Sequence, residues 1–129
     1  MQHTTEAPVK EQIRNVLNAW GVYFTMPPAN GYGRAGGFDF TCCVRGRFLG
    51  IEAKRDYKEQ PTALQHDNAA KAQRSGAVVL LIHKDNVELV RSTLDAMYKN
   101  DHPVRSYWPA RQMPAADDIP APKLRRKQP

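Results

Sequence analysis

Two consecutive segments that alternate between apolar and polar residues, 38–44 and 48–54, restrict this chain more than any other feature. Alternation at every second residue is typical of β-strands with one buried face. The buried faces are predicted to hold Phe38, Phe40, Cys42 and Val44 in the first segment and Leu49, Ile51 and Ala53 in the second. These sets meet only if Phe40 pairs with Ile51, because a slip of one residue turns every side chain to the other face. A tight turn at Arg45-Gly46 gives this hairpin register, and so does a four-residue loop.

Three segments with helical periodicity surround the hairpin. Residues 4–21 carry an apolar stripe of Val9, Ile13, Val16, Leu17 and Trp20. We expect this helix to be capped by Thr4 or Thr5 and to end at Gly21. Residues 61–76 predict a second helix capped by Thr62 and stopped by Gly76, and residues 86–100 predict a third.

Two further apolar segments, 22–28 and 77–83, are short and read as strands, the second of them buried. The order is therefore helix, three strands, helix, strand, helix. This order predicts an α/β protein whose mixed sheet of about four strands is flanked by helices.

The chain carries a formal net charge of +6, and its distribution divides the sequence in two. From His102 onward six basic residues face two acidic ones, so this Pro-rich end carries +4 and the preceding part only +2. We predict a domain over 1–101 and an extended or disordered basic tail over 102–129. Such a tail either is simply solvated or adds non-specific attraction to a polyanion.

Apolar runs and cysteine residues indicate which compartment the sequence suits. No apolar run reaches the length of a membrane span, and the polar N-terminus lacks the apolar region of a signal peptide. Cys42 and Cys43 are neighbours on a predicted strand, so their side chains should point to opposite faces. They offer neither a disulfide framework nor a metal-binding cysteine cluster, and we expect a cytoplasmic protein without a membrane partner.

Charged residues interrupt the hairpin on its second face. The predicted register places Asp39 directly opposite Glu52, with Cβ atoms about 5 Å apart, and Lys54 lies on the same face. Opposed carboxylates repel each other unless a cation lies between them, and carboxylate oxygens suit Mg²⁺ or Mn²⁺. With a nearby ammonium group, the set fits metal-assisted hydrolysis of a phosphodiester. The alternative is an ordinary solvated strand face, on which Glu-x-Lys is common.

The segments "GGFDF", "GRFLGIEAKR", "PTALQ" and "AQRSGAVVLLI" together resemble the PD-(D/E)xK nuclease superfamily. The resemblance is greatest to its VRR-NUC branch, many of whose small members are phage proteins, and it runs from about Glu6 to Ile82. It implies a restriction-endonuclease-like three-layer core, with Mg²⁺ or Mn²⁺ bound by Asp39, Glu52 and the Ala53 carbonyl. It also implies that Lys54 acts on the attacking water. Phe38 stands where the family pattern prefers Pro, a change that removes no ligand.

The resemblance extends to the predicted helices and the Gly-rich loop. The family carries a metal-binding Glu on its first helix, and we assign it to Glu6, because Glu6 continues the apolar stripe whereas Glu11 should face solvent. A first-turn acid favoured by the helix dipole is the simpler explanation of Glu6. Lys10 and Arg34 are candidate nucleic-acid contacts. Gln65 is either such a contact beside the active site or part of a capping box with Thr62.

These observations leave two functional hypotheses. The first is a metal-dependent DNA endonuclease, acting on branched or structured DNA in the cytoplasm (that of the host if the chain is phage-encoded), with a homodimer as a possible state. The second is a non-catalytic nucleic-acid-binding or assembly module that keeps the nuclease fold.

Overall fold

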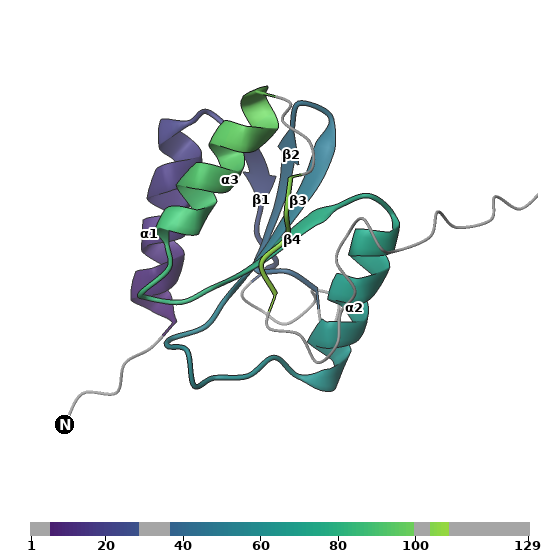
Figure 1. Ribbon diagram of the computed structural model, residues 1–129. Coiled ribbons are helices and arrows are strands. Elements are labelled where there is room, and N and C mark those ends of the chain that lie inside the picture. Colours follow the sequence, from purple (N-terminus) through teal and green to yellow (C-terminus); the bar gives the residue numbers. More distant parts are fainter. Residues whose placement is uncertain (1–5, 29–36, 100–103, 109–129) are drawn as a thin grey trace, which may run out of the picture.

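A computed structural model describes residues 6–28, 37–99 and 104–108 of the chain. The elements follow in the order helix, three strands, helix, strand, helix, as the sequence predicts (Figure 1). They are α1 (Ala7–Ala19), β1 (Tyr23–Thr25), β2 (Phe40–Val44), β3 (Arg47–Ala53), α2 (Ala63–Arg74), β4 (Val78–Ile82) and α3 (Glu88–Lys99).

The four strands form one mixed sheet in the order β1-β2-β3-β4. β1, β2 and β3 pair antiparallel, whereas β3 and β4 are parallel and are connected through α2. The predicted hairpin register is confirmed, because Phe40 pairs with Ile51 and Val44 pairs with Arg47. The turn between β2 and β3 is the tight one. Its two residues, Arg45 and Gly46, have φ values of 50° and 82°, the positive values that a two-residue hairpin turn of this type requires.

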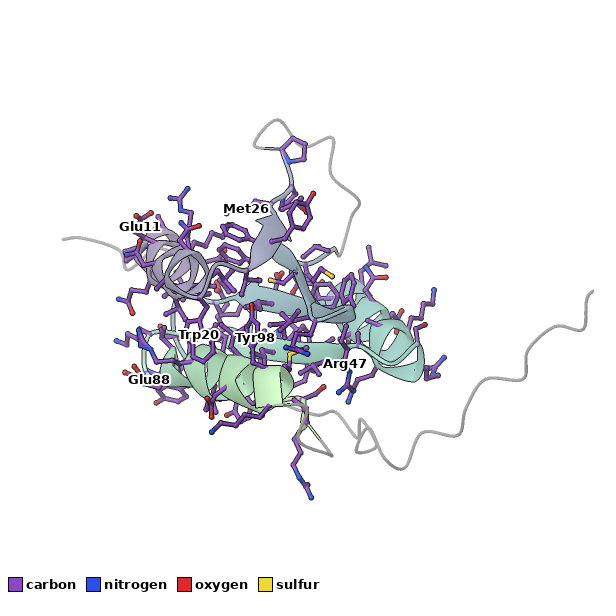
Figure 2. The ribbon with its side chains drawn as sticks, turned by 90° about the horizontal axis from the view of Figure 1, so that it is seen from above. Glu11, Trp20, Met26, Arg47, Glu88 and Tyr98 are labelled. Atoms are coloured by element: carbon purple, nitrogen blue, oxygen red, sulfur yellow. The ribbon has the colours of Figure 1, made fainter. Side chains whose placement is uncertain are left out.

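Helices cover both faces of the sheet and give three layers, with α1 and α3 on one side and α2 on the other (Figure 1). The larger core lies under α1 and α3, where apolar residues of both helices pack on the inward face of the hairpin and β4. Trp20 stacks on Tyr98 with ring centroids 5.5 Å apart and joins the two helices, as Figure 2 shows from above. The smaller core, under α2, contains Ala69, Ala77, Val79, Leu81 and Trp108.

Two local predictions are wrong. Phe38 does not share a face with Phe40, but packs in the smaller core against Trp108, with ring centroids 6.2 Å apart. It precedes the first residue of β2, so the alternation of the strand does not govern its direction. The cap of α1 is Glu6 rather than Thr4 or Thr5, and its side chain makes no capping hydrogen bond. Pro8 is the second helical residue and has no N–H for a capping side chain to bind.

Residues 104–108, at the start of the segment predicted as a tail, lie along the free edge of β4. Tyr107 N–H donates to the Val79 carbonyl at 3.0 Å, and its own carbonyl accepts from Leu81 N–H at 2.8 Å. Val104 and Trp108 are buried. This part of the segment is extended, but it belongs to the packed body. Residues 109–129 lie outside the described part of the chain. Among the helices that the structure describes, none has the length and apolar character needed to cross a membrane.

Candidate functional site

The predicted carboxylate pair forms where β2 begins and β3 ends. Asp39 directly precedes β2, and its backbone N–H donates to Glu52 Oε1 at 3.1 Å. In return, the backbone N–H of Ala53 donates to Asp39 Oδ2 at 2.8 Å. Each carboxylate therefore accepts a hydrogen bond from the strand that carries the other. This reciprocal arrangement confirms that Asp39 and Glu52 lie opposite each other, and it fixes the direction of both side chains.

Glu52 is almost fully buried, with 4% of its surface exposed. The pKa of its carboxyl is raised to about 8, first by burial and then by the negative charge of Asp39, whereas the Lys54 ammonium lowers it. A buried carboxylate loses its hydration and gains a like-charged neighbour, so its ionised form is costly. The site therefore favours a proton or another positive charge at Glu52.

Lys54 supplies one such charge from the same strand face. Its Nζ lies 3.8 Å from Glu52 Oε2, and Lys54 is buried, with 6% of its surface exposed. Nζ also donates to Gln65 Oε1 at 3.0 Å. Burial and this hydrogen bond hold the ammonium beside the carboxylate pair and do not leave it free in solvent.

Gln65 connects the site to the start of α2, because it lies beside the carboxylate pair and also forms the predicted capping box; its nucleic-acid contact stays a prediction. Its Nε2 donates to Glu52 Oε2, which places it in the site. Its Oε1 also accepts from Thr62 N–H at 2.9 Å, and its own N–H donates to Thr62 Oγ1 at 3.1 Å, which completes a capping box. The first turn of α2 and the carboxylate pair are thus tied together by a single side chain.

Lys10 approaches the pair from α1. Its Nζ lies 3.4 Å from Asp39 Oδ1 and 3.8 Å from Glu6 Oε2. Glu6 faces the site as predicted, and Lys10 bridges its carboxylate to that of Asp39. Glu11 is exposed and pairs with Arg14, in agreement with its predicted direction toward solvent; Figure 2 shows it on the outer side of α1.

A fourth acidic residue, Glu59, was missed by the sequence analysis. It lies in the connection between β3 and α2, where Arg55 N–H donates to its Oε1 at 3.1 Å. The pKa of Glu6 is raised by burial first, and then by a hydrogen bond and charge repulsion from the Glu59 carboxyl. The connection has no periodicity, so nothing in the sequence indicates that Glu59 folds back to α1.

The donor set fits a hard divalent cation in part. Carboxylate oxygens are the ligands that Mg²⁺ prefers, and Mg²⁺ commonly uses one or two protein carboxylates and completes its shell with water and phosphate oxygens. Asp39 Oδ1 faces Lys10 at 3.4 Å, longer than the roughly 2.8 Å of a charge-assisted hydrogen bond, so it retains capacity for a ligand. Within residues 6–28, 37–99 and 104–108, however, no three His, Cys, Asp or Glu side chains are grouped closely enough to hold a metal. The residues fit a site with two carboxylates, not a closed protein cage.

The remaining predicted site residues are less informative. Ala53 is buried at the end of β3, and its N–H is held by Asp39, while the metal-binding role of its carbonyl stays a prediction. Arg34 lies in residues 29–36, outside the described part of the chain. Comparison of the chain with protein-family models, curated proteins and solved structures finds no match in any of the three.

Proposed function

We propose that this chain is a Mg²⁺- or Mn²⁺-dependent DNA endonuclease with a restriction-endonuclease-like core, similar to the VRR-NUC branch of PD-(D/E)xK nucleases. The observation that carries the proposal is the reciprocal hydrogen bonding of Asp39 and Glu52 beside Lys54. It keeps two like charges together in a largely buried place, which is unfavourable unless a cation or proton joins them.

Each residue around the pair has a distinct part in the proposed reaction. Asp39 and Glu52 would hold the cation, with the Ala53 carbonyl as a further ligand, and Glu6 would contribute from α1 through a water molecule, since it is not grouped with the pair closely enough for a site of three carboxylates. A bound Mg²⁺ or Mn²⁺ would lower the pKa of a water molecule and neutralise charge on the phosphate. Lys54, held by Gln65, positions the attacking water and stabilises the charge that develops on the phosphate oxygens.

Lys10 lies at the opening of this arrangement. It is about one-third exposed and close to both Asp39 and Glu6, so its ammonium can move from these carboxylates to a substrate phosphate when a cation takes its place. DNA is the proposed substrate, in a branched or otherwise structured form. A homodimer that presents two sites to two strands is part of the proposal.

The test is cleavage of five DNA forms with Mn²⁺ or Mg²⁺: single-stranded, linear duplex, nicked, flap and four-way-junction DNA. Asp39→Asn and Glu52→Gln should abolish cleavage while the circular dichroism spectrum stays native. Glu11→Gln, which removes an exposed carboxylate from the same helix as Glu6, is the matched control and should cleave normally. Full activity of the wild-type protein in excess EDTA would refute the mechanism.

The second candidate, a non-catalytic nucleic-acid-binding or assembly module, is favoured by one observation. No group of three metal-binding side chains occurs in the part of the chain that the structure describes. Titration with Mn²⁺ separates the two candidates, because the nuclease should bind the ion in the wild-type form and lose it in Asp39→Asn. Absence of Mn²⁺ binding would favour the module.

A further inference from the structure

One face of the sheet continues from the candidate site onto strands that no helix covers completely. Positions 48, 50 and 52 of β3 alternate onto a single face, so Phe48 and Gly50 lie on the same side as Glu52. The pairing of the strands adds Thr41 and Thr25 beside Gly50, and Cys43 and Tyr23 beside Phe48. This surface, made by Tyr23, Thr25, Thr41, Cys43 and Phe48, is called the open sheet face below.

A cavity of about 470 Å³ lies between the open sheet face and α2. The large apolar residues of the lining come from β3 and the segment between β1 and β2, whereas the polar residues are Thr25 and Thr41 of the strands and three residues at α2. Phe38, Phe48, Met26 and Pro27 form the first group, and Asn68, Lys71 and Ser75 belong to the second. The volume is within the range of small-ligand sites, and an apolar wall opposite a few polar groups is their usual composition.

The aromatic residues here are exposed to an unusual degree. Phe48 keeps 40% of its surface accessible and Tyr23 keeps 72%. Phe48 leans on Phe38, with ring centroids 6.0 Å apart, and Phe38 in turn meets the edge of Trp108. The ring of Phe38 lies on the backbone at Gly50, where a Cβ atom would be only 2.8 Å away. The ring of Phe48 is therefore supported from one side while a large part of it stays accessible.

The charge that lines the cavity is positive, whereas the exposed Asp67 of α2 lies one turn before Lys71. Lys71 is the charged residue in the lining of the cavity, and it is exposed. Arg45 in the hairpin turn and Arg74 one turn after Lys71 are also exposed. An accessible aromatic ring beside lysine and arginine is the combination that binds unpaired bases by stacking and their phosphates by charge.

The cavity borders the candidate site through Phe38, although neither Asp39 nor Glu52 is among its described lining residues. Phe38 lines the cavity and is followed directly by Asp39. Along β3, Phe48 and Glu52 are separated by roughly 13 Å at the usual rise of a strand. Between these two residues the Phe38 ring lies over Gly50, so a polynucleotide strand would pass from Phe48 over this ring to reach the carboxylate pair.

We propose that the open sheet face binds a single-stranded nucleic-acid segment, with a base stacked on Phe48 and a phosphate held by Lys71. The inference rests on the proposed nuclease function and makes it more specific. The strand cut at Asp39 and Glu52 is unpaired on the side that leads to Phe48, which corresponds to a flap or a splayed junction arm and not to a continuous duplex.

A second copy of the chain is a poorer occupant of this face. In a symmetric dimer the same patch meets itself, so Arg45, Lys71 and Arg74 of both copies would approach one another. Like charges at an interface oppose association. A nucleic-acid strand is negatively charged, so these basic residues attract it and do not oppose its binding.

The experiment measures binding separately from cleavage. A fluorescein-labelled oligothymidylate is titrated with the full-length protein in EDTA at two or more salt concentrations. Phe48→Leu keeps an apolar side chain but removes the ring, and we expect it to weaken binding by roughly five- to a hundredfold. Phe48→Trp should bind at least as well as the wild type. Lys71→Gln should weaken binding and reduce the slope of log affinity against log salt by about 0.7.

Tyr57→Ala is the matched control, because Tyr57 is also exposed, at 65%, but lies in the connection between β3 and α2, away from the cavity. It should leave affinity unchanged. Equal affinity of Phe48→Leu and the wild type overturns the inference, as does a dimer in size-exclusion chromatography that Phe48→Leu dissociates without changing DNA affinity.

The two proposals can fail separately. If no DNA form is cleaved but binding depends on Phe48 and Lys71, the nuclease function fails and the single-strand site remains. If cleavage depends on Asp39 while Phe48→Leu has normal affinity and normal preference between flap and duplex, the single-strand site fails and the nuclease function remains.

Discussion

Asp39→Asn tests the electrostatics of the candidate site without requiring any substrate. Asparagine keeps the shape of the side chain and an oxygen that can accept the Ala53 N–H. It removes the negative charge that is the second cause, after burial, of the raised pKa of Glu52. We therefore expect the pKa of Glu52 to fall in the variant but to stay above its ordinary value, because Glu52 remains buried.

The size of the effect follows from the separation of the two charges. If the charges are as far apart as the Cβ atoms of directly opposite strand residues, about 5 Å, they repel by roughly 3 kcal/mol at an effective dielectric constant of about 20. The variant also loses the contact of Asp39 with Lys10, a partly exposed ion pair worth about 1 kcal/mol at most. The net gain in the free energy of unfolding should be about 2 kcal/mol when Glu52 is ionised. When Glu52 is protonated there is no repulsion to relieve, and only the small loss remains.

This difference makes the effect depend on pH. The folded wild type holds a proton on Glu52 up to a pKa of about 8, whereas the unfolded chain releases it near the ordinary value of 4.5. The folded state therefore binds more protons in this interval, and the contribution of Glu52 to stability is present below pH 4.5 and is lost as the pH rises to about 8. The loss should be smaller in Asp39→Asn, so the two melting curves should separate as the pH rises.

The measurement is thermal unfolding by circular dichroism in EDTA between pH 5 and pH 9. At about 3 °C per kcal/mol for a chain of this size, Asp39→Asn should melt roughly 6 °C above the wild type at pH 9 and at or slightly below it at pH 5.5. Glu11→Gln, the exposed control, should show a difference that does not change with pH. A constant difference for Asp39→Asn, or a lower melting temperature at pH 9, would refute the reasoning.

Three further predictions concern other parts of the molecule. Lys54→Met should retain Mn²⁺ binding in calorimetry, because the ammonium does not ligate the ion, but should lower the rate of single-turnover cleavage at least a hundredfold. Loss of metal affinity with a normal cleavage rate would contradict the role of Lys54. Gly50→Ala should lower the free energy of unfolding by about 1–3 kcal/mol in urea, since the new Cβ would lie 2.8 Å from the Phe38 ring; an unchanged midpoint would show that the ring moves freely. Removal of residues 109–129 should leave a folded protein whose DNA affinity falls less steeply with salt. Removal of residues 103–129 should unfold the protein, because Val104 and Trp108 are buried. Equal melting temperatures of the two truncated proteins would show that residues 104–108 do not stabilise the body.

Much of the fold follows from the sequence because the alternating segments allow a single register. Once Phe40 pairs with Ile51, the positions of Asp39 and Glu52 are determined, and the structure has both. Thr62 and Gln65 were predictable for a similar reason, since a capping box depends on residues only three positions apart. Local rules were sufficient wherever the interacting residues lie in one strand pair or one helical turn.

The rules failed where position depends on distant parts of the chain. Phe38 lies just outside β2 and turns toward Trp108, which is distant in sequence. Glu59 reaches Glu6 only because the connection after β3 folds back to α1. Tyr107 adds to the edge of β4 through backbone hydrogen bonds, which leave no pattern in the side chains. Each of these contacts forms only once the sheet is assembled, so no local sequence pattern predicts it.

Gln65 links the fold to the candidate site. Gln65 lies in the first turn of α2, and its side chain donates a hydrogen bond to Glu52 Oε2. This hydrogen bond favours the ionised form of Glu52, yet the pKa of the carboxyl remains about 8 because the residue is buried beside Asp39. The body of the protein would therefore be more stable at neutral pH with an uncharged residue of similar shape at this position. A cost of this kind is expected where a carboxylate serves as a cation ligand, because the bound cation replaces the proton and removes the penalty.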